Sequence, residues 1–107
     1  LTEEKLLSKD ANFRMNPPLR TEDDRKAVLE AICDGTVDAI VTDHAPHTRE
    51  EKSDFYKAPN GVIGLETSFA ASYTALVDSG LISLSRLIEL MTVNPRKLVG
   101  IGGYLPL

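Results

Sequence analysis

The feature that most constrains the fold is the shortage of strand-like sequence. Residues 13–15 and 38–42 have the short apolar pattern of strands, and the sequence between them, from Thr21 to Gly35, has helical spacing. A strand, a helix and a second strand in that order indicate an α/β fold with parallel strands. Two strands alone cannot form a parallel sheet that is buried on both faces. We therefore expect this chain to be a piece of something larger.

The rest of the chain predicts further helices around one long loop. Helical patterns occur at residues 2–8, 66–78 and 83–91 and after Asn94-Pro95. The expected caps are Thr2, Thr21 with Asp24 in a variant capping box, and Asn94. In the third of these patterns the apolar face comprises Leu84, Leu87, Ile88 and Met91. Between His47 and Gly64 the sequence is polar and rich in turn formers. A loop of this length is uncommon unless it is functional or disordered, although a charged stretch such as residues 49–57 is more often a solvated surface.

Composition and charge exclude several classes of partner. The net charge is −4, whereas nucleic-acid binding needs clustered Lys and Arg, so we expect no nucleic-acid partner. No apolar run approaches the roughly 18 residues of a membrane span. No signal-peptide pattern is present, although the start at Leu1 without a methionine leaves room for a missing upstream part. Cys33 is the sole cysteine, so no internal disulfide can form, and we expect a reducing compartment such as the cytoplasm. Its apolar neighbours, Ala31 and Ile32, predict that Cys33 is a core residue.

Asp43 is the strongest candidate for chemistry. It follows the apolar stretch at residues 38–42, and ligands collect at the carboxyl ends of parallel strands. It could bind a metal ion, act as a general base, or form a turn. His44 and His47 lie close by, but Pro46 between them makes a shared helical face improbable. Either histidine could be a ligand or a substrate contact.

Two more polar residues are candidates for ligand contact. Asn16 stands before two prolines, which would hold its direction and suit a small polar ligand, but it could equally start the turn. Arg20 could bind a carboxylate through its planar guanidinium group. It could also neutralise the acidic start of the following helix at residues 22–24.

Four motifs resemble bacterial dihydroorotases of the amidohydrolase superfamily. They are residues 15–20 (MNPPLR), 42–47 (TDHAPH), 61–67 (GVIGLET) and the Asn94-Pro95 pair, in the family's order and spacing. The Asp-His-Ala-Pro-His run is the most specific, since related hydantoinases and allantoinases keep the Asp-His pair but resemble it less beyond that pair. The resemblance covers essentially the whole chain.

The resemblance implies a fold and a domain organisation. The family fold is a (β/α)8 TIM-type barrel with a small β-sandwich built from both chain ends. Residues 1–99 would be the last quarter of this barrel, with strands seven and eight at about Arg14 and Val41 and their helices. Residues 100–107 would begin the link to the C-terminal sandwich segment.

The resemblance also implies a reaction and roles for individual residues. The family carries out the zinc-dependent, reversible cyclisation of N-carbamoyl-L-aspartate to L-dihydroorotate in pyrimidine biosynthesis. Asp43 would be the catalytic residue, which binds metal and moves the proton. The substrate-binding residues would be Asn16, His47, Pro59, Asn60 and Gly61. Of these, His47 would hold the substrate carboxylate, and the backbone at residues 59–61 would bind the pyrimidine ring. His44 would lie behind the ligands or in packing.

Most metal ligands of the family have no counterpart in these 107 residues. The strand-one His-x-His pair, a bridging Asp or carboxylated Lys, and the histidines of strands five and six are missing. One or two zinc ions would therefore be held mainly from outside this chain, and we expect the chain alone to be inactive.

The resemblance implies a homodimer for the full-length enzyme, with aspartate transcarbamoylase as a candidate partner. An alternative is an inactive dihydroorotase-like structural subunit that partners aspartate transcarbamoylase. The presence of Asp43, His47 and Asn16 argues against that alternative. A third interpretation, an independent small binding domain, is disfavoured by the incomplete sheet.

Overall fold

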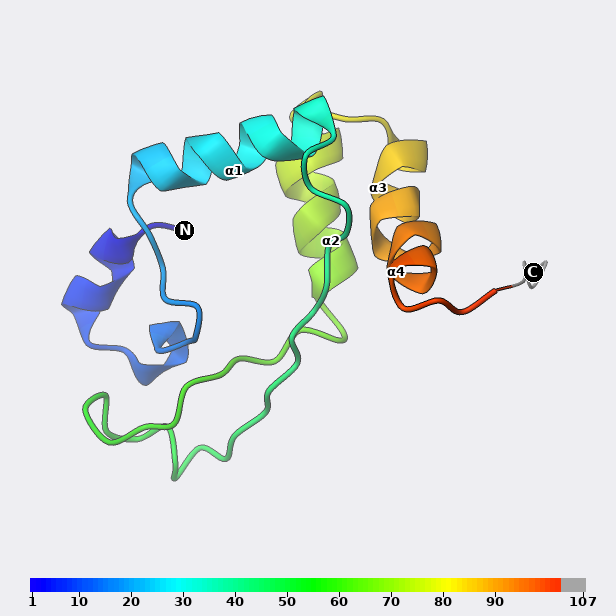
Figure 1. Cartoon of the computed structure of the whole chain (residues 1–107). Helices are drawn as coiled ribbons and strands as arrows, with labels where there is room; N and C mark the ends of the chain where they lie inside the picture. Colours follow the sequence, from blue (N-terminus) through cyan, green and yellow to red (C-terminus); the bar gives the residue numbers. More distant parts are fainter. Residues whose placement is uncertain (103–107) are drawn as a thin grey trace. The chain divides into compact units, whose positions relative to one another are not determined.

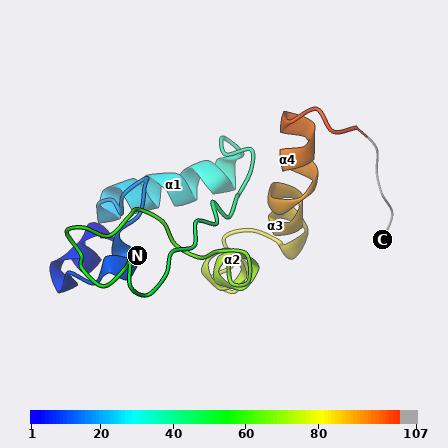
Figure 2. The ribbon, with the colours of Figure 1, turned by 90° about the horizontal axis from the view of Figure 1, so that it is seen from below.

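The computed structural model describes residues 1–102 and divides the chain into two compact units. We call them the loop unit, which comprises Leu1–Glu30 and Thr42–Ser68, and the helix unit, which comprises Ala31–Val41 and Phe69–Leu107. Figures 1 and 2 show the chain from two directions. Residues 103–107 lie outside the described part, and so does most of the link predicted at residues 100–107.

The loop unit begins with two short 3-10 helices, η1 (Glu3–Ser8) and η2 (Ala11–Phe13). η1 confirms the helix predicted for the start of the chain, although Thr2 makes no side-chain cap. Asp10 does cap η2, because its carboxylate accepts a hydrogen bond from the backbone N–H of Asn12 at 2.9 Å. Short turns with local side-chain bonds therefore order this part of the chain.

The two strands predicted around Arg14 and Val41 are not formed in the described part of the chain, and the predicted β-sandwich has no counterpart there. The carbonyl of Arg14 accepts a hydrogen bond from the N–H of Gly61 at 3.1 Å, and the N–H of Ile40 donates to the carbonyl of Leu90 at 2.9 Å. A strand needs a neighbouring strand to form its ladder. These two segments have none within the described residues, so their backbone groups bond to a loop and a helix instead.

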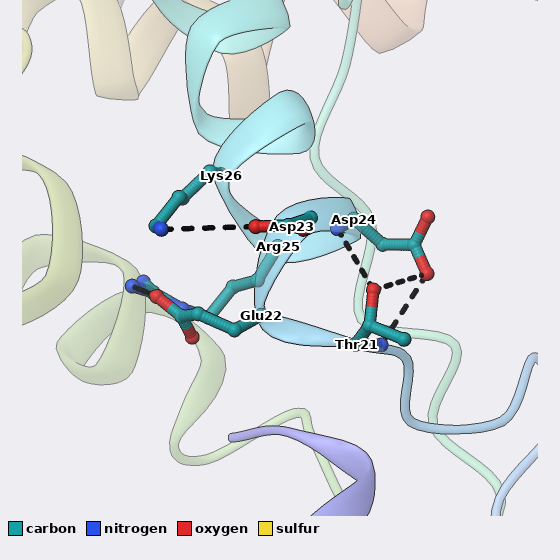
Figure 3. A network of polar contacts seen from close by, with 6 residues as sticks. All are labelled: Thr21, Glu22, Asp23, Asp24, Arg25 and Lys26. Carbon is teal, nitrogen blue, oxygen red and sulfur yellow. Dashed lines mark hydrogen bonds and ion pairs between the residues drawn. The ribbon is translucent and has the colours of Figure 1, made fainter.

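Helix α1 (Glu22–Asp34) starts at the capping box predicted for Thr21 and Asp24, which Figure 3 shows. The Thr21 hydroxyl accepts a hydrogen bond from the N–H of Asp24 at 3.1 Å. In return, the Asp24 carboxylate accepts from the hydroxyl and the N–H of Thr21, at 2.9 and 3.3 Å. These two bonds hold the pKa of Asp24 below its usual value, and the bond from the hydroxyl has the larger effect. Gly35, with φ at 89°, follows the last helical residue, as predicted.

The remaining helices are α2 (Ser68–Ser72), the π-helical turn η3 (Tyr73–Val77), α3 (Leu84–Met91) and α4 (Val93–Leu98). They confirm the three helical patterns expected in this part of the sequence. Ser83 caps α3 by accepting a hydrogen bond from the N–H of Arg86 at 3.2 Å. α4 begins one residue before Asn94, which is therefore not the cap, and the Asn94 side chain donates to the carbonyl of Asp38 at 2.9 Å. Among the described helices, none has the length and apolar character needed to cross a bilayer.

The apolar core of the helix unit is small. Its buried hydrophobic side chains are Ile32, Leu76, Leu87 and Leu90. The sequence pattern also predicts Leu84 and Ile88 on the buried face of α3, but both are exposed, because the buried stripe is centred on the two fully enclosed leucines of that helix. The prediction that Cys33 lies in the core is wrong as well. Its neighbour Ile32 is buried instead, and the Cys33 thiol donates to the carbonyl of Leu81 at 3.7 Å.

Candidate active site

The candidate site is built on two arms of the loop unit, residues 42–47 and 60–65, which run side by side (Figure 1). We call them the paired arms. His44 and Val62 form an isolated parallel β-bridge, and the N–H of Ala45 donates to the carbonyl of Val62 at 2.9 Å. This pairing brings together two motifs that the sequence predicts to belong to one site.

Two glycines let the paired arms approach each other closely. A Cβ atom on Gly61 would lie 2.7 Å from the carbonyl oxygen of Ala45, and the φ of 143° at Gly61 is itself unfavourable for other residues. A Cβ atom on Gly64 would lie 2.8 Å from the carbonyl oxygen of Thr42. The glycines of this motif therefore allow backbone to pack against backbone at two points along the arms.

His44 fastens the paired arms through its ring. Its Nδ1 accepts hydrogen bonds from the backbone N–H groups of Gly64 and Leu65, at 3.0 and 3.2 Å. Because Nδ1 accepts, the ring proton lies on Nε2. His44 is exposed, so it joins the arms by hydrogen bonds, and only Nε2 is left for any further contact. Its expected position behind the ligands or in packing stays a prediction.

The ring of His47 joins the first arm to Asn60. Its Nε2 donates to the carbonyl oxygen of Asn60 at 3.1 Å, and its Nδ1 lies 3.6 Å from the carboxylate of Glu51. The side chain of His47 is 24% exposed, so these partners enclose much of it. The backbone N–H of Thr48 donates to Glu51 and holds the pKa of Glu51 below its usual value, and His47 acts in the same direction. Both ring nitrogens of His47 therefore face oxygen atoms.

Asp43, the predicted catalytic residue, has an exposed side chain. Its backbone φ of 44° lies in the left-handed region, which few residues other than Gly, Asn and Asp adopt. Such a conformation persists where the surrounding structure fixes it, and here the bonded residues His44 and Ala45 follow directly. Within residues 1–102 no hydrogen bond or ion pair engages the Asp43 carboxylate. The carboxylate is therefore available to a ligand.

Asn16 and Arg20 lie in different environments. Asn16 is exposed, and in the described part of the chain no hydrogen bond joins it to Asp43 or His47. Arg20 donates through Nε to the carboxylate of Asp24 at 3.1 Å. Arg20 therefore neutralises the acidic start of α1, which was one of its two expected roles, and Asn16 keeps its amide free for a ligand.

The loop at residues 59–61 is held by a basic side chain that the sequence does not single out. We call this segment the ring-binding loop after its predicted role, which stays a prediction. Lys52 belongs to the charged stretch expected to be a solvated surface, yet it is half-buried. Its Nζ donates to the carbonyl oxygens of Arg14 and Pro59, both at 3.0 Å. No local signal in the sequence distinguishes Lys52 from the exposed Lys57.

Metal-ligating side chains are sparse in the described structure. No group of three or more His, Cys, Asp or Glu side chains in residues 1–102 is placed to hold a metal ion. Zinc takes four ligands in structural sites and three protein ligands in catalytic ones. Asp43 has an unpaired carboxylate, whereas His47 uses both ring nitrogens. The donors here fit one ligand position of a divalent ion, not a complete site.

Known dihydroorotases are similar to this sequence over nearly its whole length. A dihydroorotase of Streptococcus thermophilus is 53% identical over 97% of this chain and 25% of its own length. Dihydroorotases of Clostridioides difficile and a Geobacillus species are 52% and 48% identical, over 92% and 94% of this chain and 24% of their own lengths. The chain therefore spans about a quarter of the curated relatives that it matches. No family model matches the chain.

Solved structures of two hydantoinases are also similar to this chain. The L-hydantoinase (dihydropyrimidinase) of Arthrobacter aurescens has a TM-score of 0.85 and 34% identity, over 94% of this chain and 23% of that one. The D-hydantoinase of a Thermus species has a TM-score of 0.75 and 29% identity, over 85% of this chain and 21% of that one. The sequence is thus homologous to the C-terminal portion of bacterial dihydroorotases, which confirms the family that its motifs predict.

Proposed function

We propose that this chain forms part of the active site of a dihydroorotase, which interconverts N-carbamoyl-L-aspartate and L-dihydroorotate in pyrimidine biosynthesis. The observation that carries the proposal is the 53% identity to the Streptococcus thermophilus dihydroorotase over 97% of the chain. The paired arms support it, because they bring the Asp-His-Ala-Pro-His motif against the glycine motif at residues 61–64.

The fold that we propose is the last quarter of a (β/α)8 barrel over residues 1–99, followed by the link at residues 100–107. The TM-score of 0.85 with the L-hydantoinase supports this fold, since the match extends over 94% of the chain. The segments around Arg14 and Val41 would become strands once neighbouring strands of the barrel are present. Active sites of such barrels lie at the carboxyl ends of the strands, which is where Asp43 would stand.

Asp43 would be a metal ligand and the acid–base residue. The full-length enzyme would hold one or two zinc ions, and most of their ligands would come from outside this chain. When bound, zinc would supply a Lewis acid and lower the pKa of water. Asp43 would accept the proton that water loses on attacking the ring amide, and would deliver it to the departing ring nitrogen. The exposed carboxylate, which has no partner in the described residues, suits both tasks.

The ring-binding loop would contact the substrate ring through the backbone groups that remain unpaired. The carbonyls of Pro59 and Asn60 already accept side-chain hydrogen bonds, and the N–H of Gly61 donates to Arg14. Within the described residues, the N–H of Asn60 and the carbonyl of Gly61 make no hydrogen bond. One free donor and one free acceptor match the C=O and N–H groups of a cyclic amide.

His47 and Asn16 would contact the other polar groups of the substrate. In this proposal His47 holds the substrate carboxylate through Nδ1, which lies 3.6 Å from Glu51 and makes no hydrogen bond in the described residues, so the substrate carboxylate would take the place of Glu51. Because Nε2 of His47 donates to the carbonyl of Asn60, the carboxylate-binding position is joined directly to the ring-binding loop. Asn16 would add a contact through its unpaired side-chain amide.

A second candidate is a catalytically inactive subunit that assembles with aspartate transcarbamoylase. A purely structural subunit has no chemical reason to keep Asp43, His47 and Asn16 together, so we favour the enzyme. In either case we propose that the full-length protein is a cytoplasmic homodimer.

A chimera tests the proposal, in which these 107 residues replace the matching quarter of the Streptococcus thermophilus dihydroorotase. We expect the chimera to catalyse the reaction in both directions, whereas the 107 residues alone should neither turn over nor hold stoichiometric zinc. A folded chimera that binds aspartate transcarbamoylase without turnover would favour the structural subunit. A folded chimera with neither property would contradict both functions.

A further inference from the structure

Lys52 is held in an unusual way for a basic residue of a loop. It is half-buried, and its Nζ lies 3.0 Å from two carbonyl oxygens, those of Arg14 and Pro59. Among the residues described, no carboxylate lies within ion-pair distance of it. Burial, and then the charge of Arg14, lower the pKa of Lys52. An ammonium group withdrawn from water is unfavourable unless its donors are used, and here they bind backbone.

The side chain and the backbone of Arg14 reach the same segment. Its Nη1 donates to the carbonyl of Phe55 at 2.6 Å, and its Nε donates to Oδ1 of Asn60 at 3.2 Å. Its carbonyl accepts from Nζ of Lys52 and from the N–H of Gly61, at 3.0 and 3.1 Å. The Arg14 carbonyl is therefore the point at which Lys52 and the ring-binding loop meet.

These bonds fix all three residues of the ring-binding loop. Pro59 is held by its carbonyl, Asn60 by its side chain and Gly61 by its N–H. Since Pro59 has no N–H, the bond from Lys52 is the hydrogen bond that fixes its backbone in the described structure. The unpaired groups of the next two residues are thereby kept in a fixed relation to Arg14.

We propose that Lys52 is a positioning residue for substrate binding, because its contact with the carbonyls of Arg14 and Pro59 sets the conformation of the ring-binding loop. The inference rests on the proposed function, in which that loop receives the substrate ring. Lys52 itself does not contact the substrate. An anion site formed by Lys52 and Arg14 is disfavoured, because both side chains already donate hydrogen bonds within the loop unit. Lys52 donates to two carbonyls, and Arg14 donates through Nε and Nη1.

Lys57 provides the matched control. It belongs to the same charged stretch, its side chain is 86% exposed, and its Nζ lies 3.6 Å from the carboxylate of Asp54. An exposed pair of this kind contributes little to stability. Replacing Lys57 therefore removes a charge from the segment without touching the ring-binding loop.

The first measurement is amide hydrogen exchange in the folded chimera, read at the Gly61 N–H by mass spectrometry with fragmentation. Lys52→Met keeps an unbranched side chain but removes the donors, and should raise the exchange rate of the Gly61 N–H by about tenfold. Lys57→Met should change it by less than about twofold, and Lys52→Arg, which keeps charged donors, should restore most of the protection. Equal rates in Lys52→Met and Lys57→Met would overturn the proposal.

The second measurement uses the chimera and L-dihydroorotate. Lys52→Met should raise KM about tenfold and leave kcat within about threefold, because the loop contributes binding and not proton transfer. A merely structural role would lower the amount of active enzyme, and hence the apparent kcat, at constant KM. An unchanged KM in Lys52→Met would overturn the proposal. If the unsubstituted chimera has no turnover, the proposed function fails, and the exchange rate of Gly61 still decides whether Lys52 positions the loop.

Discussion

Each of the two units of this chain is stabilised internally by a different kind of interaction. In its described part, the helix unit buries four aliphatic side chains, Ile32, Leu76, Leu87 and Leu90. In the described part of the loop unit, the buried hydrophobic side chains are those of Ala11 and Ala58. An alanine side chain removes little apolar surface from water, so apolar burial contributes much less to the loop unit.

Side chains bonded to backbone take the place of a core in the loop unit. His44, Lys52 and Arg14 each make such bonds to segments distant in the sequence. Hydrogen bonds have preferred directions, whereas apolar burial has none. A unit built in this way can fix the positions of a few backbone groups, and all the candidate site residues lie in it. Apolar packing thus stabilises the helix unit, whereas directional hydrogen bonds fix the candidate site within the loop unit.

The largest loss of stability should come from the core of the helix unit. Leu87→Ala removes a side chain with 0% exposure and should lower the free energy of unfolding by about 2 to 5 kcal/mol. Leu84→Ala lies on the same helix but is 43% exposed, and should lower it by about 1 kcal/mol or less. Urea unfolding followed by circular dichroism measures both. Equal losses would show that α3 does not pack through Leu87.

The next effect should appear in the loop unit, where Gly61→Ala places a Cβ atom 2.7 Å from the carbonyl oxygen of Ala45. With the positive φ, we expect a cost of about 1 to 3 kcal/mol and displaced NMR signals for His44 and Val62. Gly35→Ala is the control, because Gly35 has φ at 89° but open space around the new Cβ. If His44 and Val62 respond equally to both substitutions, the arms are not closely packed.

Helix caps should respond alike in both units, because a cap is a local device. Thr21→Ala removes the cap of α1, and Ser83→Ala removes the cap of α3. Each should lower the free energy of unfolding by about 1 kcal/mol, while Thr21→Ser should cost much less. Urea unfolding is the measurement, and a loss confined to one cap would mean that the other contributes nothing.

The smallest effect should be a loss of stability at acidic pH. Thr21 lowers the pKa of Asp24, chiefly through its hydroxyl, and the backbone N–H of Thr48 lowers the pKa of Glu51. A carboxylate with a lowered folded pKa stabilises the fold above its unfolded pKa, and this contribution is lost as pH falls through the folded value. NMR titration should place the pKa of Asp24 below 3.8 and the pKa of Glu51 below 4.5, the ordinary values of an aspartate and a glutamate. Midpoints at or above these values would contradict the observed bonds.

Helix boundaries and the family could be predicted from the sequence because both depend on residues close together in the chain. Thr21 and Asp24 are three positions apart, and Gly35 ends the same helix by its own conformation. The Asp-His-Ala-Pro-His motif is likewise contiguous. By contrast, nothing within a segment of the sequence indicates which distant residues that segment will contact.

The strands stay a prediction, and the role of Lys52 could not be predicted, because both depend on distant partners. A strand around Val41 needs a neighbour that the described residues do not supply. Lys52 is half-buried where its Nζ donates to the carbonyl of Arg14, which is far away in the sequence. The same reason applies to α3, where the residues that become buried depend on what the helix meets.

The most direct test of the account compares two carboxylates in the chimera. Asp43 belongs to the loop unit, whereas Asp38 belongs to the helix unit, where its carbonyl accepts a hydrogen bond from Asn94. Asp43→Asn should lower kcat by about a hundredfold to ten-thousandfold, because it removes the proton carrier while keeping the size of the side chain. Asp38→Asn should stay within about twofold of the parent. Full turnover in Asp43→Asn would contradict the claim that the loop unit carries the catalytic carboxylate.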